Sequence, residues 1–359
     1  MADTTVASAN AVAQWDSDYF LEYIRGNRFN RYMGTDANSI IHLNETLTNK
    51  PGTQVTIPLI TRLKGQGVSG NSVLEGREEQ LSNYGHKITT NVLRNGVVID
   101  WLEEQKSELG LRNAAKAALK MWSMEDLRGA NGNGRGIIDA FGSFRSGDTI
   151  TSYANTSEAT KDTYLAANSD RYLFGAAKSN IASNDHSAAL ANVDSTNDKL
   201  IYQTVSLAKR IAKTADPHIR PVRVSEDEEW YVMFAPSLAF RDLKTSLATI
   251  NQNAQVRGDN NPLFRDGDLT YDGVIIREVP ELPVVTGVGA SNIDVAASYL
   301  CGAQAIGVAW AQRPVSKTQE TDYEFRHGVA IQEMRGVEKL IFNSKQHGIV
   351  TLWTAAVGD

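Results

Sequence analysis

The motif with the clearest potential for chemistry is GQGVSG, which runs from Gly65 to Gly70. Its spacing matches G-x-G-x-x-G, a loop that can surround the pyrophosphate of a dinucleotide. Such a site also needs a helix that begins at the last glycine, and an acidic residue about 20 positions later that binds the ribose. Gly76 and Gly85 interrupt any helix before the next strand begins. The pattern therefore favours a flexible loop between two strands, and we expect no bound cofactor.

A second glycine-rich segment, GANGNGRG from Gly129 to Gly136, has a composition that can surround an anion. A phosphate-binding P-loop continues with Lys and then Ser or Thr, whereas this segment continues with two isoleucines. Glycine often ends a helix, because it adopts the left-handed conformation of the C-cap without a steric penalty. We therefore expect this segment to end a helix.

The side chains that usually bind metals or act as nucleophiles do not form a recognisable set. The six histidines are widely spaced and include no H-x-x-x-H or H-E-x-x-H motif, the spacing found in many zinc sites. Cys301 lies in the apolar segment YLCGAQAIGVAW, which is typical of a buried structural cysteine. No G-x-S-x-G motif is present. We expect no metal site and no catalytic residues, so the sequence does not predict an enzyme.

Two acidic segments are better interpreted as turns than as ligand sites. The segment 266–272 has the spacing with which an EF-hand calcium loop begins, but Tyr271 stands at the sixth position, where such a loop needs glycine. The run Glu226–Glu229 precedes a predicted strand and is typical of a solvated turn. The residues with calcium-loop spacing are Asp266, Asp268, Thr270 and Asp272.

The composition indicates a folded chain that is made in a reducing compartment. Hydrophobic residues make up 42% of the 359 positions, enough for a large core in two or three domains or in one elaborated domain. The single cysteine excludes a disulfide framework, and the first residues lack a secretory signal. The most apolar stretch, Leu300–Ala311, is much shorter than the about 20 residues of a membrane span. The net charge of -6 argues against broad binding to nucleic acid phosphates.

The central part of the chain contains no proline between Pro58 and Pro217, which leaves room for long helices. We expect one helix over about 100–128, capped by Asp100, and a second over about 196–213. Residues 142–195 are rich in Ser, Thr, Asn and Ala and are predicted to be a loosely ordered loop with short helical pieces. The apolar face of the first helix consists of Leu111, Ala115, Ala118, Leu119 and Trp122.

Strands are predicted on both sides of this helical region. Residues 53–61 and 86–99 alternate apolar and polar side chains, and the polar, glycine-rich segment between them predicts a long hairpin with an extended tip. Further strands are predicted at 230–234, 273–279, 329–333 and 349–353. The first fifty residues contain aromatic and basic residues without a sustained period, so we interpret them as an arm that packs on another subunit and not in the core.

This order of elements resembles the tailed-bacteriophage major capsid proteins of the Hong Kong 97-like fold, and in particular the phage-N4-type major capsid family. The resemblance extends over most of the chain, and several segments carry it together. These segments are FNRYMGTDANSIIHLNETLTNKPGTQVTIPLITRLKGQGVSGNSVLEG, YVMFAPSLAFRDLKT, GDLTYDGVIIREVPELP and EFRHGVAIQEMRGVEKLIFNSKQHGIVTLWTAAV.

The resemblance implies an α+β fold with named domains. They are an N-terminal arm at 1–50, an extended β-hairpin loop at 51–99, a peripheral domain at 100–217 with a spine helix at about 100–128, an axial domain at 218–305, a return to the peripheral domain at 306–337, and a C-terminal axial-domain strand at 338–359.

The implied function is a coat protein that assembles through hexamers and pentamers into an icosahedral shell around double-stranded DNA, in the host bacterial cytoplasm. Many relatives carry a cleaved N-terminal scaffolding segment for which this chain has no room, so we expect a separate scaffolding protein, a portal and a decoration protein as partners, and no membrane. The mixed charges of the hairpin tip would set the register between subunits. The candidate contacts are Lys64, Glu75, Arg77, Glu78, Glu79, Arg25 and Arg28.

Two other functions stay open from the residues alone. One is a nucleotide-binding enzyme that uses Gly65–Gly70, and the other is a decoration or tail protein of a virion. For the charged cluster, a solvated loop without any partner is the alternative to a subunit contact.

Overall fold

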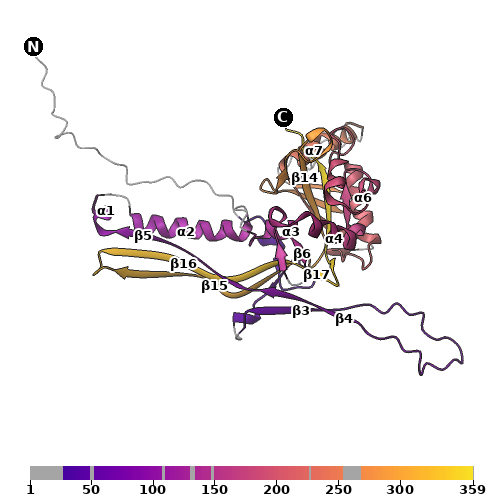
Figure 1. Cartoon of the computed structure of the whole chain (residues 1–359), viewed down its shortest axis with the longest axis horizontal. Helices are drawn as coiled ribbons and strands as arrows, with labels where there is room; N and C mark the ends of the chain where they lie inside the picture. Colours follow the sequence, from indigo (N-terminus) through magenta and orange to yellow (C-terminus); the bar gives the residue numbers. More distant parts are fainter. Residues whose placement is uncertain are drawn as a thin grey trace, which may run out of the picture.

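The computed structural model describes residues 27–48, 52–106, 110–129, 134–146, 149–225, 228–253 and 268–358. Figure 1 shows three parts: a compact body near the C-terminus, a long domain built around helix α2, and a projecting hairpin made by β3 and β4. No helix in the described ranges is both long and apolar enough to cross a membrane.

The long domain is a five-stranded sheet with a helix along it (Figure 1). Its strand order is β1 (Met33–Gly34), β2 (Ile41–Asn44), β15 (Ile306–Thr321), β16 (Arg326–Lys339) and β5 (Asn91–Asp100). The β15–β16 ladder shifts register between Gln312 and Val315, where Pro314 has no N–H to donate. The first five residues of β15 are buried and the strand is exposed from Arg313 onward, so this sheet begins in the body and extends away from it.

Two helices, α1 (Trp101–Lys106) and α2 (Leu111–Arg128), replace the single helix predicted over 100–128. The chain has Gly110 immediately before α2, and glycine in a helix interior is about 1 kcal/mol less favourable than alanine. The predicted end of the helix is confirmed, because Gly129 adopts a left-handed φ of 89° and its N–H bonds the carbonyl of Glu125. Leu119 of α2 packs with Val329 and Ile331 of β16, which holds the helix on the sheet.

The body contains an eight-stranded mixed sheet. Six strands follow the order β11 (Asp268–Tyr271), β12 (Val274–Glu278), β10 (Glu228–Ala235), β14 (Val295–Cys301), β19 (Ile349–Ala355) and β8 (Tyr172–Phe174). Strand β9 (Arg223–Ser225) pairs with β10, and β13 (Val284–Val285) pairs with β14. Every residue of β14 and β19 is buried, which is typical of strands whose two faces are both covered.

Helices cover both faces of this sheet, and the side chains of β10 alternate between them. Met233 packs in the cluster that contains the apolar residues of α6 (Tyr202–Thr214) and α7 (Ser237–Asn253). Phe234 packs in the cluster of α3 (Ile137–Gly142), α4 (Glu158–Asn168) and α5 (His186–Ala191). The predictions of strands at 230–234, 273–279, 329–333 and 349–353 and of a helix near 196–213 are confirmed, whereas β14 was not predicted.

The prediction of a loosely ordered loop over 142–195 is wrong. This segment contains β6 (Phe144–Ser146), β7 (Thr149–Thr151), α4, β8 and α5, and it buries Leu165 and Phe174 completely. Strand β8 is an edge of the body sheet, and α6 covers a face of that sheet. Elements on both sides of the predicted domain boundary at 217–218 therefore belong to the body.

The described part of the predicted N-terminal arm lies in the core. Phe29 is fully buried, and its ring contacts those of Phe141 and Phe234 at centroid distances of 5.8 and 5.2 Å. Ile41 is also fully buried in β2, which pairs in parallel with β15. The expectation that this segment stays outside the core is wrong for Phe29, Ile40 and Ile41, because tertiary contacts and not local periodicity place them. Residues 1–26 lie outside the described part of the chain.

The predicted hairpin is present with one correction. Strand β3 (Gln54–Ile60) pairs antiparallel with β4 (Asn83–Thr89), but the chain leaves the hairpin at Thr90 and continues as β5 in the long sheet. Val55 and Ile88 at the hairpin base pack with Leu340, just before β17 (Ile341–Phe342), which pairs with β18 (Lys345–Gln346). Apolar packing therefore anchors the hairpin at its base.

Candidate functional site

The part of the hairpin beyond its strands, residues 61–82, forms neither helix nor strand and extends away from the rest of the chain (Figure 1). We call these residues the projecting loop. Large apolar side chains on the loop and next to it are more than half exposed, although water disfavours such exposure. They are Ile60, Leu63, Val73, Leu74 and Leu81.

Hydrogen bonds hold the two sides of the projecting loop together near its base. The Glu79 carboxylate accepts the backbone N–H groups of Lys64 and Gly65, each at 2.6 Å. These two donors lower the pKa of Glu79. Farther out, the Glu78 carboxylate accepts the N–H of Gly76 at 2.7 Å, a local bond within the loop. The loop has a defined base, and its outer part depends on local contacts.

One charged contact joins the loop base to the body. The Lys64 ammonium donates to the Asp216 carboxylate at 2.8 Å, and Arg62 lies 3.5 Å from the same carboxylate. The bond from Lys64 lowers the pKa of Asp216. Both side chains of the Lys64–Asp216 pair are more than half exposed, so solvent screens this contact and it contributes little to stability.

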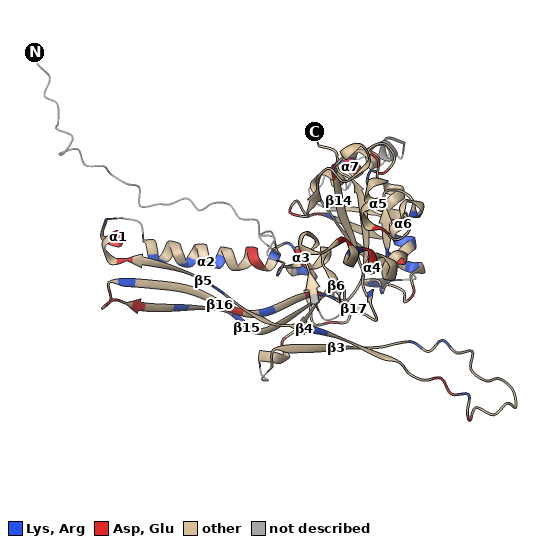
Figure 2. Ribbon diagram, in the orientation of Figure 1, with Lys and Arg blue, Asp and Glu red and all other residues tan. Residues whose placement is uncertain are grey.

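The other predicted contact residues occupy different environments. The side chains of Glu75 and Arg77 are exposed on the projecting loop and form no ion pair within the described residues. Arg28 instead donates to the backbone carbonyl of Glu278 in the body at 2.8 Å. Arg25 lies outside the described residues. Figure 2 shows both acidic and basic residues along the projecting loop. The structure thus groups the loop residues and separates Arg28 from them.

The geometry of the loop does not suit a dinucleotide. Gly67 and Gly70 both have a left-handed φ of 67°, and a side chain at either position would meet no atom within 4 Å. No helix begins after Gly70 anywhere in residues 71–82, so the positive helix end that binds a pyrophosphate is missing there. The loop therefore does not have the shape with which a G-x-G-x-x-G motif binds a pyrophosphate.

The other candidate chemical groups have structural roles. Cys301 is fully buried in β14, and burial raises the pKa of its thiol, which disfavours the reactive thiolate. Asp272 forms the turn between β11 and β12, where its carboxylate contacts Lys209 at 3.2 Å and Ser206 at 3.1 Å. Asp266 lies outside the described residues.

Two surface features were missed in the sequence. The first is a groove of about 590 Å³ between the hairpin and the body, lined by Leu59 and Tyr84 on one side and by His218 and Phe342 on the other. The hydrophobic alternation of β3 and β4 predicted the strands that form one wall of the groove. The residues of the opposite wall lie far from these strands in the sequence. The groove lies between the base of the projecting loop and the body.

The second missed feature is an apolar end of the long domain, which we call the distal tip. It comprises the turn between β15 and β16 and the start of α1, joined by the N–H of Trp101 bonding the carbonyl of Phe325 at 2.8 Å. Tyr323 is completely exposed, and Trp101 is 48% exposed. Aromatic residues within the polar segment TDYEFR are the signal that could have identified this tip.

Buried charges join α2 to the long sheet at the end of the helix that lies away from the distal tip. Arg335 of β16 pairs with Asp126 of α2, and its Nε donates to Glu333 at 3.0 Å. Ser123 of α2 also donates to Glu333, at 3.2 Å, and burial raises the pKa of that carboxyl. These bonds fix the helix on the sheet.

Comparisons with known proteins agree on one family. The sequence profile of the family described as "Phage capsid protein" matches residues 3–357. The chain is 29% identical to the major capsid protein of Pseudomonas phage KPP25 over 367 aligned residues, which cover 95% of this chain and 94% of that protein.

Solved structures show the same similarity in three dimensions. The capsid of cyanophage Pam1 has a TM-score of 0.90 and 36% identity, with both chains covered completely. The capsid of Ralstonia phage GP4 has a TM-score of 0.74 at 21% identity and 99% coverage of both chains, which supports the fold. The Helicobacter pylori bacteriophage KHP30 capsid also shares the fold, with a TM-score of 0.69 at 13% identity, covering 97% of this chain and 96% of that one.

Proposed function

Since this chain belongs to the phage capsid protein family, we propose that it assembles through hexamers and pentamers into the icosahedral head shell of a tailed bacteriophage, around double-stranded DNA. It is a major capsid protein of a phage, and its fold is the Hong Kong 97-like fold. The family and the fold that the sequence resemblance implied are therefore confirmed.

The projecting loop is the observation that supports assembly. Its exposed apolar side chains have few neighbours within the chain, and its glycines lose much backbone entropy on becoming ordered. An isolated two-stranded hairpin is marginally stable in water. Contacts with a neighbouring subunit would cover the apolar side chains and offset this entropy, so the loop acts as a clasp between subunits.

The distal tip supplies a second contact surface at the opposite end of the molecule. Tyr323 and Trp101 are exposed there on a rigid support of helix and sheet. Aromatic side chains are enriched in the centres of protein interfaces. In this assignment the long domain is the peripheral domain, with α2 as its spine helix, and the body is the axial domain.

The remaining partners follow from the role of a shell subunit. A separate scaffolding protein directs closure, a portal occupies one vertex, and a decoration protein binds the finished shell. Assembly takes place in the host bacterial cytoplasm. The net charge of -6 keeps the contact with packaged DNA weak and independent of sequence. The protein carries out no catalysis and needs no cofactor.

Electron microscopy of the purified protein tests this proposal. The protein alone should form hexamers, pentamers or shells, and addition of its scaffold should increase the yield of closed shells of one size. A decoration or tail protein would bind preformed shells without forming them. A preparation that stays a small oligomer under all these conditions would contradict the proposal.

Calorimetry tests the nucleotide-binding alternative. NAD, FAD and ATP should show no saturable binding to the protein, because no helix begins in residues 71–82, directly after the glycines of the projecting loop. Micromolar binding that disappears in Gly67→Val would favour the enzyme instead.

A further inference from the structure

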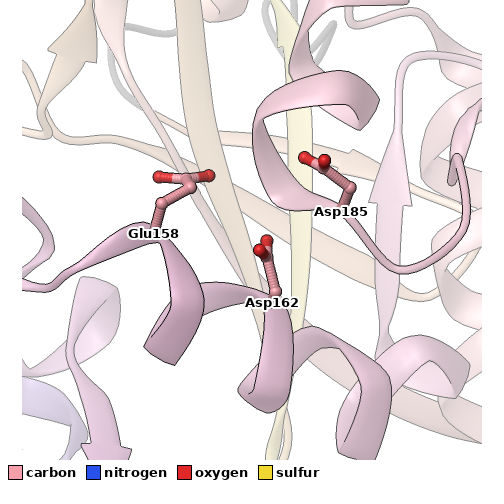
Figure 3. Close-up of side chains that lie close together, drawn as sticks. All are labelled: Glu158, Asp162 and Asp185. Carbon is pink, nitrogen blue, oxygen red and sulfur yellow. The ribbon is translucent and has the colours of Figure 1, made fainter.

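Among the features outside the two subunit contacts, the acidic cluster of the body has a structural role. One oxygen from each of Glu158, Asp162 and Asp185 lies within 4.8 Å of the others, beside the starts of α4 and α5 (Figure 3). Asp162 and Asp185 accept the backbone N–H groups of His186 and Ala188, at 2.8 and 2.9 Å. The first N–H groups of a helix have no partner inside the helix. Capping of α5 therefore accounts for the positions of the two aspartates.

The edge of the long sheet, in contrast, is open. Strand β5 has ten residues, pairs with β16 on one side and has no partner strand among the described residues on the other. The opposite edge strand of this sheet, β1, has two residues, and the edge strands of the body sheet, β11 and β8, have four and three. A free edge presents N–H and C=O groups that can pair with a strand of another chain.

Strand β5 lacks the features that usually protect a long edge, which are proline, lysine, a bulge or a covering element. It contains neither proline nor lysine, and its ladder with β16 runs from Asn91 to Asp100 without a register shift. Three of its valines are exposed, Val92 by 52%, Val97 by 39% and Val98 by 65%. The strand therefore offers both backbone groups and apolar side chains to another strand.

The ladder shows which N–H groups of β5 point outward. The N–H of Trp101, the residue after β5, bonds the carbonyl of Phe325, the residue before β16, so it points toward β16. N–H groups alternate in direction along a strand, so those of the even-numbered residues from 92 to 100 point away from β16. Gly96 agrees with this direction, because its N–H bonds the side-chain oxygen of Asn95 at 2.9 Å and not a carbonyl of β16.

The charges of this edge are complementary to themselves. Arg94 is exposed and forms no ion pair within the described residues, and Asp100 lies on the same face of the strand. Two antiparallel copies of β5 centred on Val97 would place each Arg94 opposite Asp100 of the other copy, and each Gly96 opposite Val98. A register centred on Asn95 would instead bring the two Arg94 side chains diagonally together, which like charges disfavour.

We propose that β5 pairs antiparallel with β5 of a second copy of this chain, about a two-fold axis at Val97. The outward N–H and C=O groups of residues 94, 96, 98 and 100 would bond their partners, and the long sheets of the two subunits would become one continuous sheet. The two Val97 residues would form a non-hydrogen-bonded pair, in which side chains lie closest.

Symmetry assigns this contact a place in the shell, and here the inference rests on the proposed function. A two-fold contact joins the same surface of both subunits, whereas the subunits of a ring of five or six bind head to tail. The β5 contact therefore joins subunits of neighbouring hexamers and pentamers, and does not hold either ring together.

Disulfide trapping in the assembled shell tests the register. In Val97→Cys, the two Cα atoms would lie about 4.5 Å apart, which a disulfide can bridge. Val98→Cys is the matched control, because residue 98 is more exposed, yet the two copies of it would lie diagonally at about 7–8 Å. The natural Cys301 is fully buried. Under mild oxidation with copper phenanthroline, most Val97→Cys chains should become covalent dimers, and at most a tenth as many Val98→Cys chains. No dimers from Val97→Cys, or equal amounts from both variants, would overturn the proposal.

Hydrogen exchange of the wild type gives a test without substitutions. The N–H groups of Gly96 and Val98 should exchange at least tenfold more slowly in closed shells than in separate hexamers and pentamers, because only the shell contains the two-fold contact. Equal exchange in the two states would contradict the pairing.

Charge variants at Arg94 separate this contact from the proposed function. Arg94→Glu places two acids opposite each other twice in each contact, so the yield of closed shells should fall at least tenfold while hexamers and pentamers form as in the wild type. Arg94→Gln, which adds no repulsion, should give an intermediate yield, and 1 M NaCl should restore shells of Arg94→Glu by screening. Normal shells from Arg94→Glu would overturn the β5 contact alone. A wild type that forms neither rings nor shells would contradict the proposed function, and this contact with it.

Discussion

The guanidinium of Arg335 and the carboxylate of Asp126 form an ion pair inside the protein, where each side chain is only 1% exposed. Arg335 belongs to β16 and Asp126 to the last turn of α2, so the pair joins this helix to the long sheet. Glu333, fully buried, shares the same guanidinium. The contact therefore fixes α2 on the sheet at the C-terminal end of the helix.

Removal of the cation should destabilise the fold strongly. Arg335→Met removes the guanidinium that contacts two buried acids, Asp126 and Glu333, and we expect a loss of about 3–5 kcal/mol in the free energy of unfolding. Urea denaturation of the unassembled subunit measures it. Arg326→Met is the matched control, because Arg326 pairs with Asp100 at the surface and should contribute about 1 kcal/mol or less. Similar losses in the two variants would show that the buried pair has no special role.

Phe29 should behave as a core residue. Its fully buried ring packs between Phe141 and Phe234, so Phe29→Ala should lower the free energy of unfolding by about 3–5 kcal/mol. Thr35→Ala, at an exposed position in the same segment, should change it by about 0.5 kcal/mol or less. Chemical denaturation distinguishes the two. A stable Phe29→Ala subunit would restore the interpretation of this segment as a detachable arm.

Lys339 should make the stability depend on pH. Its side chain is 1% exposed, close to Cys301 and to the ring of Tyr164, and burial lowers its pKa to about 7. Between about pH 10 and pH 7 the unfolded chain binds a proton that the folded chain does not, so lowering the pH in this window destabilises the fold. Below about pH 7 both states are protonated and the difference stays constant.

The Lys339→Met variant tests this dependence. Relative to the wild type, the variant should gain stability as the pH falls from 10 to 7, up to a value on the order of 4 kcal/mol. Urea denaturation at several pH values gives the difference between the two proteins, in which the other titrating groups cancel. A difference that does not vary with pH would mean that the folded state keeps Lys339 charged throughout.

Local sequence patterns predicted the elements whose own residues have a typical spacing or a typical end residue. The alternation in β3 and β4 and the glycine at 129 identified the hairpin and the end of α2. Strand β14 was missed because both of its faces are buried, so its sequence does not alternate. Strand β8 has three residues and pairs with a strand near the C-terminus, and no local signal reports such a pairing.

The site was predicted only in part for the same reason. The glycines and charges of the projecting loop are contiguous in the sequence, and they identified the loop. The Lys64–Asp216 contact joins residues 152 positions apart. Contacts of this kind arise from the fold and cannot be derived from the spacing of residues.

The loop between Ile60 and Asn83 offers a clean deletion, because these two residues face each other as the last pair of the hairpin. Replacing residues 61–82 with Asn-Gly should form a tight two-residue turn. The unassembled variant should keep nearly the stability of the wild type, because the contacts it loses are exposed. Closed shells should not form. Normal shells from this variant would contradict the role of the loop as a clasp.

Hydrogen exchange of the loop amides in the two states of the wild-type protein tests the central claim most directly. In the unassembled subunit, amides from 66 to 81 should exchange rapidly, whereas those of Val55 and Ile88 in the paired strands should be protected. In the assembled shell, the loop amides should become protected while those of the paired strands change little. Equal exchange of the loop in both states would contradict the claim that neighbouring subunits order it.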